Sequence, residues 1–248
     1  MFPILKSLLS KGIVTENKSQ KDESFLLDNF QNFIKINEKL CQTCLKPVCA
    51  EACPTGALQC GENKKIEASY LRCIECYNCS DKCPHKAISF AEYGAGSSVI
   101  NMLQEKLETD ISKNFGGSFH IRQLDGGSCN GCDHEMVSAC NPYFDISRFG
   151  IDFVASPRHA DCLLITGPVT WNLKEAVLRT IEATPQPRVI AAMGVCAISG
   201  APFSKNYSNF GGVDKVVPVD IYIPGCPPHP YALLSGLLNI MKKAAARK

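Results

Sequence analysis

Short apolar runs alternate with helical patterns over the second half of the chain. Five runs predict buried strands: "SFHIRQLD" (118–125), "IDFVAS" (151–156), "DCLLITG" (161–167), "PRVIAAMG" (187–194) and "VVPVDIYIPG" (216–225). Helical patterns occur in "CDHEMVSAC" (132–140), "NLKEAVLRTIEA" (172–183) and the segment 230–248. Apolar strands that alternate with helices are typical of a parallel sheet covered on both faces. We therefore predict a flavodoxin-like α/β domain in residues 118–248.

Two amphipathic stripes lie in the first half of the chain. The first comprises Phe2, Ile4, Leu5, Leu8, Leu9 and Ile13, with Lys6 and Lys11 among them. Such a segment either lies on a membrane surface or docks to a membrane subunit, or it packs on the adjoining domain. The second comprises Val99, Leu103, Leu107 and Ile111, and it predicts a connecting helix that ends at "NFGG". We expect an N-terminal segment at 1–30, a small domain at 31–92, a linker helix at 93–117 and the α/β domain at 118–248.

Charge and hydropathy exclude several classes of protein. The 26 basic residues nearly balance the 24 acidic ones, which argues against a nucleic-acid-binding surface. No apolar run approaches the ~18 residues that a membrane span needs. The N-terminus has neither a twin-arginine pair nor a small-residue cleavage site, so we expect no export signal.

Fifteen cysteines are the unusual feature of the composition. They lie in tight clusters, and their number is odd, so metal ligation in a reducing cytoplasm explains them better than disulfides do. The segments "CQTCLKPVCAEACP" (41–54) and "CIECYNCSDKCP" (73–84) are two copies of one pattern. The second is the full bacterial ferredoxin run C-x2-C-x2-C-x3-C-P, and the first has two extra residues before its third cysteine. An α+β, ferredoxin-like domain with two [4Fe–4S] clusters is therefore expected.

The ferredoxin run also predicts which cysteine binds which cluster. Three closely spaced thiolates hold one cluster, and the cysteine before proline binds the other one. The first cluster would then be held by Cys41, Cys44, Cys49 and Cys83, and the second by Cys53, Cys73, Cys76 and Cys79. The alternative is a pair of zinc knuckles, but zinc sites rarely use eight cysteines in two quartets that end in Cys-Pro. Cys60 belongs to neither quartet, and we interpret it as an ordinary small apolar residue.

A third quartet is spread over the predicted α/β domain. Its members are Cys129, Cys132, Cys196 and Cys226. Each follows the end of a predicted strand, where open α/β sheets collect ligands, so we expect them to hold a third [4Fe–4S] cluster. Glycines and prolines in "GGSCNG", "MGVCAISG" and "PGCPP" would let the main chain approach such a cluster. A four-cysteine zinc site is the alternative. Cys140 and Cys162 are expected to be packing residues.

The motifs of residues 119–235 resemble a known family. The stretches "CNGCDHEM", "RFGIDFVASPRHADCLLITGPVT", "MGVCAISG" and "VDKVVPVDIYIPGCPP" are similar to the small, cluster-bearing subunit of membrane-bound [NiFe] hydrogenases, including formate hydrogenlyase, and to the homologous complex I subunit beside the quinone site. The C-x-x-C at Cys129 favours the hydrogenase branch, since the complex I homologues carry adjacent cysteines there. Residues 1–90 resemble the two-cluster ferredoxin subunit of the same complexes, normally a separate polypeptide.

The resemblance implies an electron-transfer subunit with no active site of its own. Electrons would pass through the three clusters to or from a catalytic site on a hydrogenase-like large subunit, since this chain has no spare quartet of cysteines for a nickel–iron site. Membrane-arm subunits and a donor such as ferredoxin or a formate dehydrogenase module would be further partners, on the cytoplasmic face of the membrane. The alternatives are the same role in a nickel-free or complex I-like quinone oxidoreductase, and a zinc-stabilised binding module without redox chemistry.

Several other polar residues have open interpretations. Glu135 matches a glutamate position of the relatives, and is either a proton relay beside the third cluster or an acid at a helix N-terminus. Arg158 and His159 either raise the potential of the cluster or contact a partner or cap a loop. Trp171 is expected to pack or to contact a partner. The other histidines are expected to be structural or at the surface; they are His85, His120, His134 and His229.

Overall fold

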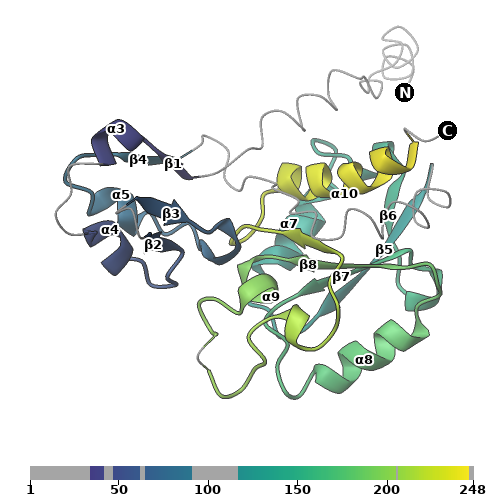
Figure 1. Cartoon of the computed structure of the whole chain (residues 1–248). Helices are drawn as coiled ribbons and strands as arrows, with labels where there is room; N and C mark the ends of the chain where they lie inside the picture. The colour runs from purple at the N-terminus through teal and green to yellow at the C-terminus, as the bar shows by residue number, and fades with distance from the viewer. Residues whose placement is uncertain (1–33, 42–46, 62–64, 91–116, 205, 246–248) are drawn as a thin grey trace, which may run out of the picture.

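The structure is a computed structural model that describes residues 34–41, 47–61, 65–90, 117–204 and 206–245. These residues form a small α+β part, up to residue 90, and a larger α/β part from residue 117 (Figure 1). None of the helices within the described ranges is long and apolar enough to cross a membrane. The two amphipathic stripes lie outside the described residues, so the helices predicted for them, and the domain boundaries, stay predictions.

Five parallel strands form the sheet of the α/β part. They are β5 (Phe119–Asp125), β6 (Ile151–Phe153), β7 (Cys162–Thr166), β8 (Val189–Met193) and β9 (Ile221–Ile223). Their order in the sheet is β6-β5-β7-β8-β9, and every pairing is parallel. This is the doubly wound, flavodoxin-like order, and it confirms the predicted parallel sheet. The residues of β7 and β8 are buried throughout, which explains their unbroken apolar runs.

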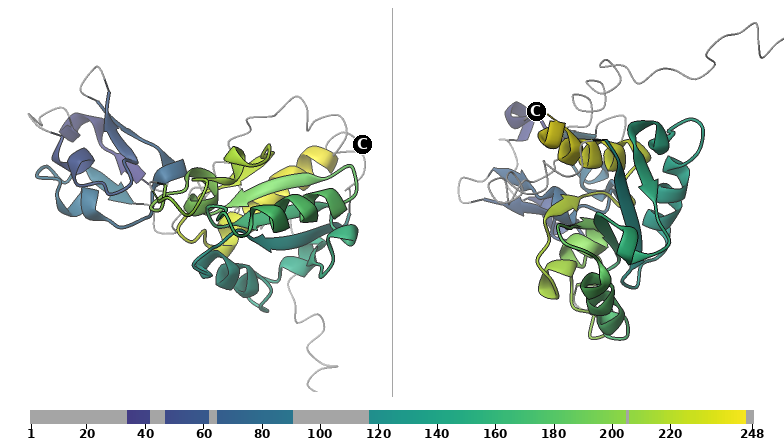
Figure 2. Two further views of the ribbon diagram at one scale, coloured as in Figure 1. Left: turned by 90° about the horizontal axis from the view of Figure 1, so that it is seen from below. Right: turned by 90° about the vertical axis from the view of Figure 1, so that its right-hand side faces the viewer.

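Helices cover both faces of this sheet (Figure 2). On one face α7 (Gly131–Ala139) and α10 (Pro230–Ala245) bury a core with the inward side chains of the strands, among them Phe119, Leu164 and Leu233. On the other face α8 (Lys174–Ala183) and α9 (Val195–Ser199) bury a second core around Leu163 and Val177. Alternate residues of β7 therefore belong to different cores, as the two-residue period of a strand requires.

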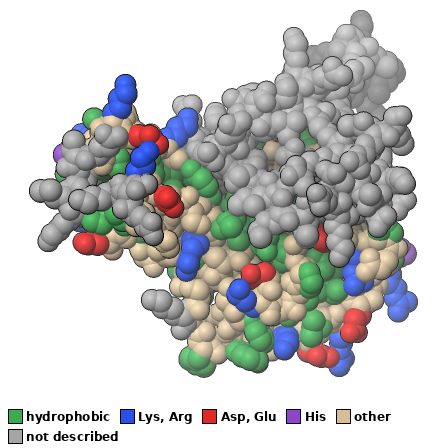
Figure 3. Space-filling model, in the orientation of Figure 1, with side chains coloured by type: hydrophobic (Ala, Val, Ile, Leu, Met, Phe, Trp, Pro, Cys, Tyr) green, Lys and Arg blue, Asp and Glu red, His purple; other side chains and the backbone are tan. Residues whose placement is uncertain are grey.

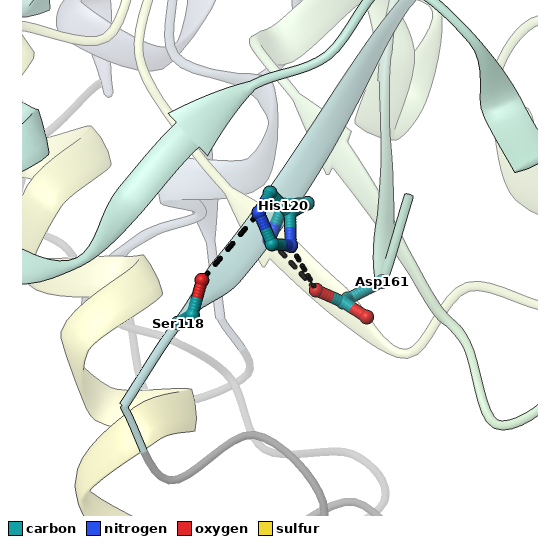
Figure 4. A network of polar contacts seen from close by, with 3 residues as sticks. All are labelled: Ser118, His120 and Asp161. Atoms are coloured by element: carbon teal, nitrogen blue, oxygen red, sulfur yellow. Dashed lines mark hydrogen bonds and ion pairs between the residues drawn. The ribbon is translucent and has the colours of Figure 1, made fainter. Parts of the chain in front are cut away.

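A polar contact holds the amino ends of β5 and β7 together (Figure 4). The Asp161 carboxylate accepts a hydrogen bond of 2.8 Å from the main-chain N–H of His120, and it lies 3.2 Å from Nδ1 of the same histidine. The N–H of Asp161 in turn donates to the carbonyl of His120. Ser118 Oγ lies 3.4 Å from the other ring nitrogen. His120 is thus a structural residue at the sheet edge opposite the cysteines.

The small part is built from two copies of one unit. Each unit has a one-turn helix, α4 (Val48–Glu51) or α5 (Asn78–Asp81), followed by a strand, β2 (Leu58–Cys60) or β4 (Ile88–Phe90). The strand β1 (Ile34–Ile36) pairs antiparallel with β4, and β2 pairs antiparallel with β3 (Ile66–Ala68). The short helix α3 (Glu38–Cys41) follows β1. This arrangement confirms the internal repeat and the α+β, ferredoxin-like fold of the small part.

A short segment of the small part packs against the α/β part. The 3₁₀ helix η1 (Tyr70–Arg72) of the small part lies against α9, and the side chain of Leu71 packs on the core beneath α8 and α9. Figure 1 shows the small part beside α9, at the end of the sheet where the strands point. Acidic and basic side chains are interspersed over the described part of the face in Figure 3, in line with a net charge of +2.

Candidate iron–sulfur sites

The third predicted quartet lies at the carboxyl edge of the parallel sheet. Cys129 is in the loop after β5, Cys132 is the second residue of α7, Cys196 is the second residue of α9, and Cys226 follows β9. The four thiols lie close enough that each of Cys129, Cys196 and Cys226 acts on the pKa of Cys132 by its charge. The structure thus brings together four residues that are as much as 97 positions apart in the chain, counting from 129 to 226.

Asp125, the last residue of β5, shapes the loop that carries Cys129. Its Oδ1 accepts hydrogen bonds from the main-chain N–H groups of Gly127 and Ser128, at 2.8 and 2.7 Å. This is an Asx-type turn, which an Asp before two glycines favours. We did not assign Asp125 a role from the sequence, although "DGGS" contained that signal.

Asp133, next to Cys132, holds α7 to the sheet. Its carboxylate accepts hydrogen bonds from Ser128 Oγ at 2.7 Å, Gln123 Nε2 at 2.8 Å and Thr166 Oγ1 at 3.3 Å. The donors come from the loop and from two neighbouring strands, so this network orients the first turn of α7, where Cys132 lies. The sequence carried no signal for Asp133, because its donors are brought together only by the fold.

Burial and mutual repulsion raise the pKa values of three of these thiols, those of Cys132, Cys196 and Cys226. Burial, followed by the charges of the neighbouring cysteines, raises the pKa of Cys132 and raises that of Cys196 to about 11. The pKa of Cys226 is raised for the same reasons, with Glu75 adding to the effect. These three thiols are therefore protonated at neutral pH, and a metal must displace their protons to bind.

The second predicted quartet lines one cavity in the small part. Cys53, Cys73, Cys76 and Cys79 all contribute to its wall. The remaining wall is almost wholly apolar, with Ile34, Leu58, Ile74 and Phe90 among its residues, and the space inside, open mouth included, is about 310 Å³. A cavity bounded by four thiols and apolar side chains fits an iron–sulfur cluster, because apolar walls exclude the water that would compete for iron.

Main-chain N–H groups point at the sulfur atoms in both copies of the repeat. The N–H of Ala57 donates to Cys53 Sγ at 3.2 Å, and the N–H of Ala87 donates to Cys83 Sγ at 3.3 Å. Burial alone would raise the pKa of Cys53, but N–H donors and the Thr55 hydroxyl outweigh burial and lower it. Donors of this kind stabilise the thiolate form that binds iron.

Three members of the first quartet lie in the described residues. Cys49 and Cys83 are buried in the core of the small part, and Cys41 packs against that core. Burial, with the charges of Cys83 and Cys41, raises the pKa of Cys49, so the three thiols are neighbours. Cys44 lies outside the described residues.

The donor sets fit clusters better than single ions. Within the described ranges no three His, Cys, Asp or Glu side chains converge on one metal ion. A cubane binds each thiolate through a different iron atom, so its four ligands need not converge on one point. The close main-chain approach at Gly194 supports the same interpretation: a Cβ there would lie 2.5 Å from Cys132 Sγ.

Glu135 lies on α7, close enough to His229 for its charge to act on that residue. The ring of His229 lies 5.5 Å from that of Phe144 and 5.4 Å from that of Tyr231. Nδ1 of His229 accepts a hydrogen bond of 3.2 Å from the N–H of Tyr231 in the first turn of α10. A proton-relay role for Glu135 stays a prediction.

We expect the stability of the chain to fall below pH 6.5 because of His229. Burial lowers the pKa of His229 below its ordinary 6.5, although the charge of Glu135 opposes this. The folded state therefore favours the neutral ring. This contribution to stability is fully present above pH 6.5, the pKa of the unfolded state, and it is lost as the pH falls from 6.5 towards the lower pKa of the folded state.

His229→Asn keeps an acceptor for the N–H of Tyr231 but does not titrate. When the pH is lowered from 7 to 5, the melting temperature of the His229→Asn variant should fall by about 2 °C less than that of the wild type. His134→Asn, an exposed control, should follow the wild type, and identical slopes for all three chains would contradict the prediction.

The remaining predicted residues lie away from the cysteine sites. Arg158 and His159 are on η3 (Pro157–His159), which leads into the amino end of β7, the edge opposite the third quartet. Trp171 is 57% exposed, and its ring lies at a tilt against that of Phe210, with the ring centroids 4.0 Å apart. Its indole N–H donates to the carbonyl of Tyr207, so Trp171 both packs and offers a surface.

The cysteines outside the three quartets differ from one another. Cys162 is fully buried, as predicted. Our prediction for Cys140 was wrong: α7 ends at Ala139, and the next residue is exposed rather than packed. Cys60, at the end of β2, is exposed as well.

Comparisons with known proteins place this fold and these sites in one class, the iron–sulfur subunits of redox complexes. Residues 129–240 match the family described as NADH ubiquinone oxidoreductase, 20 kDa subunit, and residues 67–89 match the 4Fe-4S binding domain. The chain is 42% identical over 141 residues to a probable membrane-bound hydrogenase subunit of Pyrococcus furiosus, a match that covers 57% of this chain and 84% of the relative. It is 45% identical over 130 residues to formate hydrogenlyase subunit 7 of Escherichia coli, covering 52% and 51% of the two chains. It is 48% identical over 113 residues to a subunit of the NADH-quinone oxidoreductase of Heliobacterium modesticaldum, covering 45% and 65%.

The chain belongs to the NADH ubiquinone oxidoreductase 20 kDa subunit family. It is an iron–sulfur electron-transfer subunit of the type found in membrane-bound hydrogenase, formate hydrogenlyase and complex I-like complexes. This confirms the family that the cysteine motifs indicated.

Proposed function

We propose that this chain carries electrons through three [4Fe–4S] clusters to or from a catalytic site on a hydrogenase-like large subunit. The observation that supports the proposal is the grouping of the cysteines. All predicted ligands except Cys44 lie in the described residues, and within each predicted quartet these thiols are neighbours. When bound, such clusters would each accept and release electrons at a potential that their surroundings set.

The side chains and main chain around each quartet would set the conditions for this chemistry. Thiolates would hold the iron, the N–H groups of Ala57 and Ala87 would stabilise negative charge on sulfur, and apolar walls would keep water out. Asp133 would keep Cys132 in place through its three hydrogen bonds. We propose that this chain has no active site of its own, so the substrate would be turned over on the partner subunit.

The relatives also suggest where the chain works. Two of them are named as subunits of a membrane-bound hydrogenase and of formate hydrogenlyase. We therefore propose a peripheral position on the cytoplasmic face of the membrane, with membrane-arm subunits as neighbours and with ferredoxin or a formate dehydrogenase module as electron donor. The similarity to a subunit of an NADH-quinone oxidoreductase supports a second candidate, the same electron-carrying role beside a nickel-free large subunit.

Metal analysis of the native complex would test both candidates. The tagged complex would be extracted anaerobically from membranes and analysed for iron, nickel and zinc together. Three cubanes predict about twelve irons from this chain, and a nickel content near one per complex would support the hydrogenase candidate. Abundant iron without nickel would favour the second candidate. A colourless chain that holds zinc in place of iron would contradict the electron-transfer proposal.

A further inference from the structure

Glu75 stands in an unusual place within the second cysteine run. It lies between Cys73 and Cys76, and its main chain has a φ of +56°, a conformation that residues with a side chain rarely adopt. Its side chain is half-buried rather than turned to solvent. A long charged side chain in a strained, partly buried position needs a compensating contact.

That contact crosses from the small part to the α/β part. The carboxylate of Glu75 lies within reach of the main-chain N–H of Cys226, which acts on it as a hydrogen-bond donor and belongs to the third quartet. Burial raises the pKa of Glu75 to about 7, and the hydrogen bond works against that rise. A loop that carries two cysteines of the second quartet is thus tied directly to a cysteine of the third.

The surroundings of this bond belong to the same junction. η1 immediately precedes Cys73 and lies against α9, which carries Cys196. Leu71 anchors η1 in the core of the α/β part. Next to it, Arg72 has a buried Nε without a hydrogen-bond partner among the described residues. Apolar packing therefore supports one side of the junction, while the bond from Glu75 is a polar contact that reaches a cysteine itself.

We propose that Glu75 is a positioning residue that sets the separation of the second and third sites by holding the main chain at Cys226. The inference rests on the proposed function, because the separation matters only if both sites hold redox centres. Electron transfer between two centres slows steeply as they move apart, so a tie between their ligand loops acts directly on the rate. Positioning of this kind needs the reach of the side chain and an acceptor oxygen, and it does not need the charge.

Two substitutions separate reach from charge. Glu75→Gln keeps the length of the side chain and an acceptor oxygen but loses the charge. Glu75→Asp keeps the charge but is shorter by one methylene, and Asp tolerates a positive φ well. Glu67→Gln, at an exposed position on β3, is the matched control for the loss of one negative charge in the small part.

The experiment uses the full chain, loaded anaerobically with iron and sulfide. The first measurement is iron content, and the second is the magnetic interaction between reduced clusters in electron paramagnetic resonance spectra. The third is hydrogen exchange at the Cys226 amide, followed in the loaded and in the metal-free chain. In Glu75→Asp we expect unchanged iron, a weakened interaction and about tenfold faster exchange at this amide. Glu75→Gln and Glu67→Gln should stay close to the wild type.

The possible results are distinguishable. If Glu75→Asp matches the wild type in both interaction and exchange, or if Glu75→Gln fails as Glu75→Asp does, the positioning role is wrong. If Glu75→Asp loads poorly, exchange at Cys226 in the metal-free chain still decides, because the hydrogen bond needs no cluster. A wild-type chain that takes up no iron would instead overturn the proposed function, and the exchange measurement would still report on the bond.

Discussion

A chain with both Cys129→Ala and Cys132→Ala is expected to bind about eight irons instead of about twelve. The two thiols are half of the third quartet, and a cubane left with two ligands at an open sheet edge should not persist. The two sites of the small part should remain filled, because their ligands lie in a separate core. The complex should therefore keep reducible clusters but lose electron delivery to its catalytic partner. Iron analysis and redox titration of the anaerobic complex would measure both effects.

Cys140→Ala is the matched control for this double substitution. It removes a cysteine from the same helix region, but this one is exposed and belongs to no quartet. It should leave the iron content and the electron delivery unchanged. The assignment of the third site would be wrong if the double variant kept about twelve irons, or if Cys140→Ala lost as many as the double variant did.

The strands and the cysteine groups could be predicted because their signals are local. β7 and β8 are apolar throughout because both of their faces are covered, and the ferredoxin spacing of Cys73, Cys76 and Cys79 is complete in the sequence. The third quartet needed one further rule, that the carboxyl ends of parallel strands meet at one edge. That rule uses only the order of elements, which the sequence also contains.

The contacts that hold the sites in place could not be predicted in this way. Asp133 receives hydrogen bonds from a loop and from two strands, and Glu75 reaches across to another part of the molecule. Neither partner set has a sequence spacing that points to it. The error at Cys140 has a similar cause, because a helical pattern does not tell where the last turn of a helix meets solvent.

The close approach of the main chain to the third site depends on Gly194. This residue stands between β8 and α9, with φ +87° and ψ 152°, a combination that is nearly confined to glycine. A Cβ at this position would lie 2.5 Å from Cys132 Sγ, far inside normal contact. The N–H of Gly194 also donates to the carbonyl of Ile223, which ties the end of β8 to β9 and limits how far the main chain can retreat.

Gly194→Ala is therefore expected to damage the third site specifically. The added methyl must displace the sulfur of Cys132 or the loop that carries Cys196, so we expect the loss of about four irons. The strained conformation should also lower the free energy of unfolding by about 1–3 kcal/mol. Iron analysis and chemical denaturation of the anaerobic chain would measure the two effects separately. The iron loss should exceed what any stability loss explains, because the clash is with a ligand itself.

Gly131→Ala gives the matched comparison for this substitution. Gly131 is the first residue of α7 and lies in the same quartet region, but a Cβ there would lie 3.5 Å from Cys129 Sγ and 3.7 Å from Pro227, both ordinary contacts. Alanine also suits a helix better than glycine does, so this variant should bind about twelve irons and be at least as stable as the wild type. A Gly194→Ala chain that loaded as fully as Gly131→Ala would mean that the main chain at residue 194 does not press on a ligand of the third site. The steric argument for placing a cluster against this loop would then fail, and only the grouping of the thiols would support the third site.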